Sequence, residues 1–178
     1  MNMESKLISV LKTGDRNRIE KIFEEIYEKY YKLLYFCVGS YITQKEDIED
    51  IVMDTFLSFF NNLDSIDLDG NIKNYLVRSA KNKAINLQKK KREVLIENIE
   101  EYSLDFDNDS NGNDLMDIIR DSLNDDEREL FLSHVIEDIS LRKLSKMRDE
   151  NINTTKSKYH RIRKKLYEIL EGRQWKNY

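Results

Sequence analysis

Proline is absent from this chain, and glycine occurs only five times in its 178 residues. Proline breaks helices and glycine punctuates hairpins, so their scarcity favours helices over a sheet. Apolar residues also recur at steps of three and four along most of the chain, which is the spacing of an amphipathic helix. We therefore predict an all-α protein, and the length allows one ordinary domain or two small ones.

Three helices are predicted before residue 64. A short helix over 4–13 ends at Gly14, and a long helix starts after Asp15. The segment Thr43-Gln-Lys-Glu46 has the spacing of a capping box, in which each side chain satisfies a free backbone amide, and it predicts the start of a third helix. The outer side of that helix carries an acidic stripe of Asp47, Asp50 and Asp54.

Charge is segregated along the chain. The formal charge is −6 over residues 1–70, +8 over 71–92, −14 over 93–138 and +8 over 139–178, which together give the net charge of −4. The block 71–92 holds no acid, and Asn71 can cap a helix there. Concentrated positive charge in an acidic chain creates a local field that attracts a polyanion. Two basic blocks separated by an acidic one indicate two nucleic-acid contacts.

The acidic segment 93–112 is irregular and too polar to bury a core, so we predict a flexible linker between a domain over 1–92 and a domain over 113–178. In the second domain, Asn124-Asp-Asp-Glu127 has the spacing of a capping box that leads a helix to about residue 137. The other helices expected there span 114–123, 140–147 and about 152–170. A short helix, a polar turn and a longer basic helix form a helix-turn-helix, whose second helix can enter a major groove.

Five stretches resemble the motifs of bacterial RNA polymerase sigma factors of the extracytoplasmic-function group. In the first domain they read DIEDIVMDTF at 47–56 and YLVRSAKNKAINLQKKKR at 75–92. In the second domain they read LNDDEREL, EDISLRKLS and NTTKSKYHRIRKKL, all within 123–166. The resemblance implies two small helical domains, an N-terminal helical bundle and a C-terminal helix-turn-helix domain joined by the acidic linker. It also implies an alternative sigma factor that binds core RNA polymerase and directs promoter recognition, DNA melting and transcription initiation.

The chain departs from the family's motifs at several positions, most of them in the second domain. Tyr75 stands where the family usually has tryptophan, and Asn86 replaces aspartate. In the second domain, two aspartates replace frequent glycines, and other changes alter charge or polarity: Asp138, Lys143, Ser145, Asp149 and Thr155.

The resemblance assigns three sets of residues. Melted DNA of the minus-ten element would meet the basic helix, where Tyr75 can stack on an unpaired base, and the loop 61–70 would receive an extruded base. The minus-ten set is Tyr75, Arg78, Lys81, Asn82, Lys83, Asn86, Lys89 and Lys90. The minus-thirty-five set is Asn153, Thr154, Lys156, Ser157, Lys158, His160 and Arg161, with Asn151 or Asn153 capping their helix. The polymerase-binding set is Asp47, Glu49, Asp50 and Asp54.

The implied partners are core RNA polymerase, through its β′ clamp and β flap, and promoter DNA, with an anti-sigma factor as a further possible partner. No cofactor is expected, and His134 and His160 lack the neighbours of a metal site. No constellation suggests catalysis, so we expect no enzyme activity. The lone Cys37 fits a reducing cytoplasm, and no apolar run approaches the length of a membrane span.

Less specific readings stay open at this point. The basic and acidic faces could be ordinary solvated surfaces, with Tyr75 half in the core. The chain could also be a stand-alone helix-turn-helix DNA-binding regulator, or a sigma-like adaptor or antagonist without promoter recognition. The acidic stripe favours a chain that binds polymerase over the stand-alone regulator.

Overall fold

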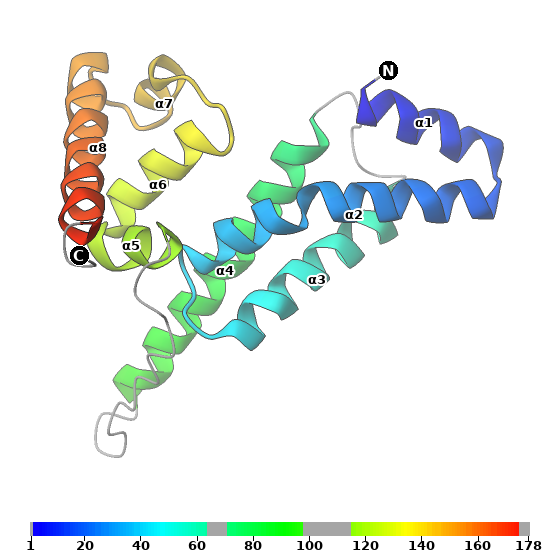
Figure 1. Ribbon diagram of the computed structural model, residues 1–178, viewed down its shortest axis with the longest axis horizontal. Helices are drawn as coiled ribbons and strands as arrows, with labels where there is room; N and C mark the ends of the chain where they lie inside the picture. The colour runs from blue at the N-terminus through cyan, green and yellow to red at the C-terminus, as the bar shows by residue number, and fades with distance from the viewer. Residues whose placement is uncertain (1, 64–70, 98–114, 175–178) are drawn as a thin grey trace. The chain divides into compact units, whose positions relative to one another are not determined.

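The computed structural model describes residues 2–63, 71–97 and 115–174, and these residues form eight helices and no strand (Figure 1). The prediction of an all-α protein is confirmed. The helices are α1 Met3–Thr13, α2 Arg16–Gly39, α3 Lys45–Asn61, α4 Ile72–Glu97, α5 Leu115–Ser122, α6 Asp125–Val135, α7 Leu141–Met147 and α8 Ile152–Gln174.

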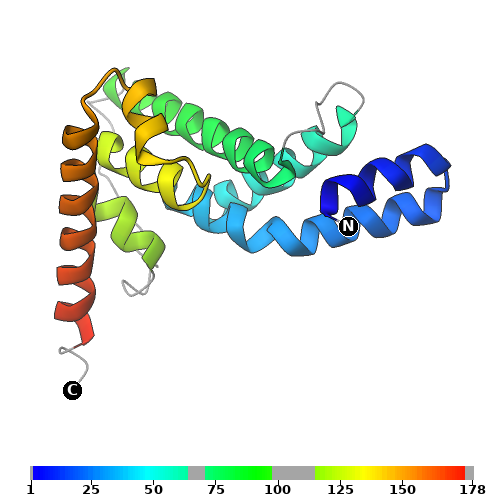
Figure 2. The same cartoon turned by 90° about the horizontal axis from the view of Figure 1, so that it is seen from above.

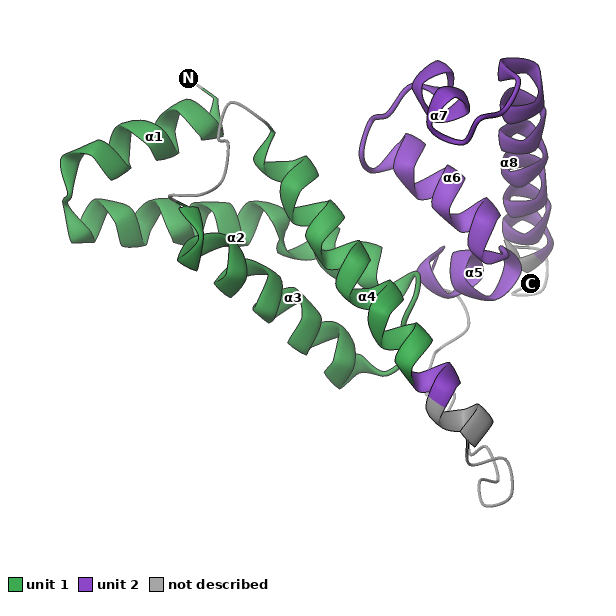
Figure 3. Ribbon diagram, turned by 180° about the vertical axis from the view of Figure 1, so that it is seen from behind, with its two compact units in different colours: residues 1–90 green, residues 91–178 purple. Residues whose placement is uncertain are grey.

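The chain divides into two compact units, residues 1–90 and 91–178 (Figure 3). The sequence placed the domain boundary after residue 92 and a linker over 93–112. Helix α4 continues to Glu97, so the first five residues of that predicted linker are helical. The stretch 93–97 contains neither glycine nor proline, so nothing in it ends the helix. The rest of the predicted linker, residues 98–112, lies outside the described residues.

In the first unit, α1 and α3 both pack against the long helix α2 (Figure 2). Helix α1 ends where Gly14 takes a left-handed φ of 64° and donates its amide to Leu11 O. Glycine has no Cβ to resist that conformation. The Asp15 side chain then accepts the amides of Asn17 and Arg18 and starts α2, as the sequence predicted.

The predicted capping box at the start of α3 is wrong. The helix begins at Lys45, Gln44 holds the N-cap position, and no side chain caps it. Thr43 therefore lies one residue too early, and Glu46 falls at the second helical position instead of the third. The two side chains cannot make the reciprocal contacts that define a capping box.

Helix α4 is held to the rest of the first unit along one broad arc. Its buried residues are Ile72, Leu76, Val77, Ala80, Lys81 and Ala84. At the start of the helix, the Ile72 amide donates to Glu4 Oε1 of α1 at 3.1 Å. Further along, the Gln88 side chain donates to the carbonyl of Tyr41, just after α2, at 3.3 Å. These two hydrogen bonds hold α4 to α1 at its start and to the segment after α2 further along.

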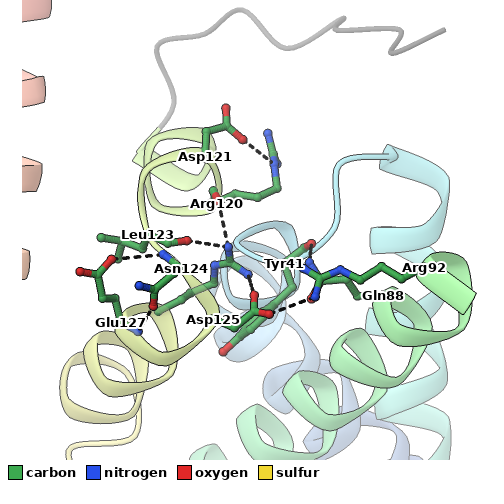
Figure 4. A network of polar contacts seen from close by, with 10 residues as sticks. Tyr41, Gln88, Arg92, Arg120, Asp121, Leu123, Asn124, Asp125 and Glu127 are labelled. Carbon is green, nitrogen blue, oxygen red and sulfur yellow. Dashed lines mark hydrogen bonds and ion pairs between the residues drawn. The ribbon is translucent and has the colours of Figure 1, made fainter. Parts of the chain in front are cut away.

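In the second unit, α8 packs against α5, α6 and α7, and α6 also packs against α7. The core is aliphatic and includes Ile118, Ile119, Leu130, Leu132, Leu144, Ile162 and Leu166. The capping box at the start of α6 is confirmed (Figure 4). Asn124 Oδ1 accepts the Glu127 amide at 2.9 Å, and Glu127 Oε2 accepts the Asn124 amide at 3.2 Å.

Arg128 is buried beside this cap, which the sequence did not signal. Its Nη2 donates to the carbonyls of Arg120 and Leu123, each at 2.9 Å, and its Nη1 donates to Asp125 at 3.2 Å. Carbonyls at the end of a helix lack partners inside that helix. Arg128 supplies donors to two carbonyls at the end of α5, and its charge is neutralised by Asp125.

Two aspartates adopt the left-handed backbone conformation, Asp138 with φ 56° and Asp149 with φ 50°. These are two positions where the sigma motifs often carry glycine. At the end of α7, Glu150 N donates to Ser145 O and Asp149 N donates to Lys146 O. This hydrogen-bond pair is a Schellman motif, which requires a left-handed residue at the position of Asp149. Aspartate tolerates that conformation better than most residues, but less well than glycine.

We predict that Asp149→Gly raises the thermal unfolding midpoint of the chain, because it relieves strain that a side chain with a Cβ meets at φ 50°. The gain should be up to about 1 kcal/mol, because the greater freedom of glycine in the unfolded chain offsets part of the relieved strain. Asp149→Ala should lower the midpoint, and Asp149→Asn should leave it nearly unchanged, since asparagine also tolerates this conformation. A glycine variant no more stable than the alanine variant would show that the turn imposes no strain.

Candidate nucleic-acid interface

Five of the residues predicted to handle melted DNA form one exposed line on α4. Tyr75, Arg78, Asn82, Asn86 and Lys89 are all exposed, and they follow one another at steps of three or four. At about 100° per residue, such steps place them within one arc of the helix, opposite its buried arc. We call these five residues the α4 stripe. Lys90, also in the predicted set, is exposed next to it.

Tyr75 lies at the edge of the stripe and belongs partly to the core. The residue is 36% exposed, and its ring centroid is 5.6 Å from that of the fully buried Phe59, at an interplanar angle of 50°. Phe59 therefore holds the ring in place while part of the ring remains open to solvent. A fixed aromatic ring with an open side is suited to stacking on a base.

The prediction that Lys81 is an exposed cation is wrong. Its residue exposure is only 6%, because Lys81 lies one turn after Val77 and one turn ahead of Ile85, towards the buried side of the helix. Helical periodicity predicted Lys81 on the exposed face of α4, because its angular position around the helix axis is close to that of Arg78. The packing of α4 buries a wider arc than its aliphatic residues alone indicate.

Lys83 makes three contacts with α3 instead of projecting from the stripe. Its Nζ donates to Asp54 Oδ2 at 2.6 Å, to Asp54 O at 3.0 Å and to Ser58 Oγ at 2.9 Å. The Lys83 side chain is 27% exposed and that of Asp54 64%. One residue predicted to bind DNA and one predicted to bind polymerase are thus paired with each other. We call this group the Lys83 clasp.

The outer face of α3 combines acids with apolar side chains. Glu49 and Asp50 are exposed and Asp47 is half-buried. Two apolar residues on the same helix, Met53 and Leu57, are 48% and 52% exposed. Neither residue was in the predicted polymerase-binding set, although helical periodicity places both away from the buried face of α3.

The second basic surface lies on α8, in the second unit. Asn151 Oδ1 accepts the Asn153 amide at 2.8 Å, so Asn151 caps the helix. Six of the seven predicted residues are exposed: Asn153, Thr154, Lys156, Ser157, His160 and Arg161. The structure buries Thr155 among them, and its hydroxyl donates to Glu150 Oε2 at 3.2 Å. This contact accommodates a polar side chain where the sigma motif has an apolar one.

Lys158, the seventh residue, is held by acids of its own unit. Its Nζ lies 2.6 Å from Glu150 Oε1 and 3.7 Å from Asp126 Oδ2. The hydrogen bond from Lys158 lowers the pKa of the Glu150 carboxyl below its ordinary value, and Thr155 and Arg148 add to the effect. Glu150 is therefore ionised at neutral pH and joins the turn to α8.

Other classes of site are not visible in the described part of the chain. Residues 2–63, 71–97 and 115–174 contain no group of three or more His, Cys, Asp or Glu side chains arranged to hold a metal ion. No helix within those ranges is long and apolar enough to span a membrane. The predicted base-receiving loop 61–70 is described only as far as residue 63, so residues 64–70 lie outside the described residues.

Residues 26–94 match the sigma-70 region 2 family. Ninety residues of the chain are 30% identical to the ECF RNA polymerase sigma factor SigW of Bacillus subtilis, over 51% of this chain and 46% of that protein. The alignment thus spans less than half of that relative's length.

Two solved structures share the fold. CnrH, in complex with the cytosolic domain of CnrY, has a TM-score of 0.60 at 18% identity, covering 96% of this chain and 99% of that chain. The sigma factor RpoE of Bartonella quintana, in complex with the anti-sigma factor NepR, has a TM-score of 0.61 at 21% identity, covering 85% of this chain and 98% of that chain.

We predict that the Lys83 clasp stabilises the first unit by its charge pairing. Asp54→Lys should lower the free energy of unfolding by about 1 kcal/mol, because it places a second cation against a partly buried lysine. Lys83→Asp combined with Asp54→Lys should recover much of that loss. Chemical denaturation followed by circular dichroism measures both. Equal stability of the single and double variants would show that the clasp contributes no charge interaction.

Proposed function

The resemblance of this chain to the extracytoplasmic-function sigma factors is confirmed by its sigma-70 region 2 domain and its similarity to SigW, and from that premise we propose that it is an alternative sigma factor. It binds core RNA polymerase, recognises a promoter and helps to open the DNA for initiation. The observation that carries the proposal is the α4 stripe, which lies within the region 2 match. The stripe places an aromatic ring, amides and cations along one acid-free helix arc.

Each class of side chain in the stripe has a separate task. Arg78 and Lys89 neutralise phosphates, which gives affinity independent of sequence and sensitive to salt. Tyr75 stacks on an unpaired base of the melted minus-ten element. Asn82 and Asn86 have amide groups that can pair with base edges, and amides are the side chains that most often read adenine. Together they favour single-stranded DNA that has left the duplex.

The proposal assigns polymerase binding to the outer face of α3. Asp47, Glu49 and Asp50 supply the negative charge that suits a basic partner, and Met53 and Leu57 supply apolar contact area. Complementary charge speeds encounter and rejects wrong partners, and buried apolar contacts give most of the affinity. The partner on this face is the β′ clamp. Asp54 contributes less to this contact with polymerase, because its carboxylate is already paired with Lys83.

In the second unit, the exposed residues of α8 hold the duplex at the minus-thirty-five element, and the same unit meets the β flap. Because the sigma factor RpoE was solved with an anti-sigma factor, an anti-sigma partner is part of the proposal as well. The proposal includes no cofactor and no enzyme activity, because the family that residues 26–94 match consists of transcription initiation factors.

The proposal is tested by size-exclusion chromatography of the chain with core polymerase, followed by run-off transcription from pooled genomic promoter fragments. A sigma factor co-elutes with core polymerase and makes transcripts that core polymerase alone does not make. Co-elution without new transcripts would identify an adaptor or antagonist. DNA binding without co-elution would identify a stand-alone regulator.

We predict that Asp50→Lys weakens co-elution with core polymerase, because it reverses an exposed charge on the α3 face without touching the core. The affinity should fall by about tenfold or more, as for like charges brought together at an interface. Glu24→Lys, the same charge change on an exposed position of α2, serves as the control and should co-elute like the parent. Normal binding by Asp50→Lys would place the polymerase contact elsewhere.

We also predict that Tyr75→Ala impairs promoter opening by one to two orders of magnitude, which matches the roughly 1–3 kcal/mol of one stacked base. Permanganate reactivity of unpaired thymines measures opening, and footprinting measures the closed complex, which should survive. Tyr75→Phe keeps the ring and its contact with Phe59, so it should open promoters like the parent. Loss of thermal stability in Tyr75→Ala, without a specific loss of opening, would assign the ring to the core alone.

A further inference from the structure

Helix α7, the first helix of the helix-turn-helix, has an exposed cationic face that the sequence analysis did not assign to any partner. Leu144 and Ser145 are buried, whereas Arg142, Lys143 and Lys146 are exposed. At about 100° per residue, the three cations fall within about a third of the helix circumference. We call these three residues the α7 face.

The three cations of the α7 face are not neutralised by the described part of the protein. None of them forms an ion pair with any acid in residues 2–63, 71–97 or 115–174. Other cations of the same unit are paired: Arg148 and Lys158 contact Asp126 and Glu150, and Lys165 contacts Glu127. Asp126 and Glu150 are therefore already occupied by other cations, and the α7 face forms no ion pair within the described residues.

The α7 face is held rigidly. Ser140 Oγ accepts the Lys143 amide at 3.3 Å and caps the start of the helix. The Schellman motif closes its end, and the helix packs directly on α8. The backbone that carries these cations consequently keeps a fixed position relative to α8. In a helix-turn-helix, the first helix crosses the sugar-phosphate backbone while the second enters the groove.

One of these cations reverses the charge of the sigma motif. Lys143 stands where the sigma motif has glutamate, so a group that repels phosphate is replaced by one that attracts it. Lysine acts as a point charge and carries no fixed pattern of donors for reading a base edge. Its contribution to DNA binding is therefore to affinity and placement.

We propose that the α7 face is a second DNA contact, which binds duplex phosphates beside the surface of α8. The inference rests on the proposed function, since it takes duplex DNA as the partner of the second unit. Charge complementarity favours duplex DNA because phosphates form a continuous polyanion along it. The contact adds sequence-independent affinity and leaves base selection to α8.

The test measures binding of the full chain to a fluorescein-labelled duplex of random sequence by anisotropy, over a series of salt concentrations. The variant is Lys143→Gln with Lys146→Gln. The control is Lys12→Gln with Lys21→Gln, which changes the net charge equally at exposed positions of the first unit. The slope of log affinity against log salt should become shallower by about 0.9 for each phosphate that the variant no longer neutralises. The control should keep the parent's slope.

A slope that is the same in the variant, the control and the parent overturns the inference. So does a variant that keeps its DNA slope and instead fails to co-elute with core polymerase, which would make the α7 face a protein interface. A parent chain that binds no duplex at any salt concentration also overturns it. Co-elution with core polymerase then decides separately whether the proposed function fails as well.

Discussion

Helix α4 must bury one arc and expose the other, and the first unit depends on that division. The buried arc includes small and aliphatic residues such as Leu76, Ala80 and Ala84. The exposed arc has no acid from residue 71 to residue 92. A core built on one side thus fixes the orientation of a cationic surface on the other. Any slip of α4 about its axis would bury charge and expose apolar area, both of which cost free energy.

Internal ion pairs decide which of the many cations are left for partners. Lys83 is held by Asp54 and Ser58, and Lys158 by Glu150 and Asp126. Lys89 on α4 and Arg161 on α8 are instead exposed. Charge counts along the sequence locate basic blocks. They do not distinguish cations that pair with acids of the same protein from cations that face solvent. That separation depends on acids brought close by folding, at separations such as the 29 residues between Lys83 and Asp54.

Much of the fold was predictable because its signals are local. Gly14, Asp15 and the Asn124–Glu127 capping box mark helix ends within a few residues, and they lie where the sequence placed them. The predictions that proved wrong concern features that depend on tertiary packing or on the exact residue at which a helix begins. The burial of Lys81 follows from how α4 packs in the folded first unit. Thr43 misled because its spacing matched a capping box while α3 begins one residue later. For the candidate site, the exposed α4 stripe followed from periodicity. Periodicity also leaves Met53 and Leu57 off the buried face of α3, but their apolar character gave no reason to assign them to a partner.

The hydrogen bond from the Ile72 amide to Glu4 has a consequence for the order in which the first unit forms. The two residues are 68 positions apart in the chain. The hairpin of α1 and α2 joins helices that are adjacent in the sequence, so it can form early, whereas this contact closes a long loop and forms more slowly. On a ribosome, Glu4 emerges well before its donor has been made. The start of the basic helix is therefore completed, late in folding, by a side chain made 68 residues earlier.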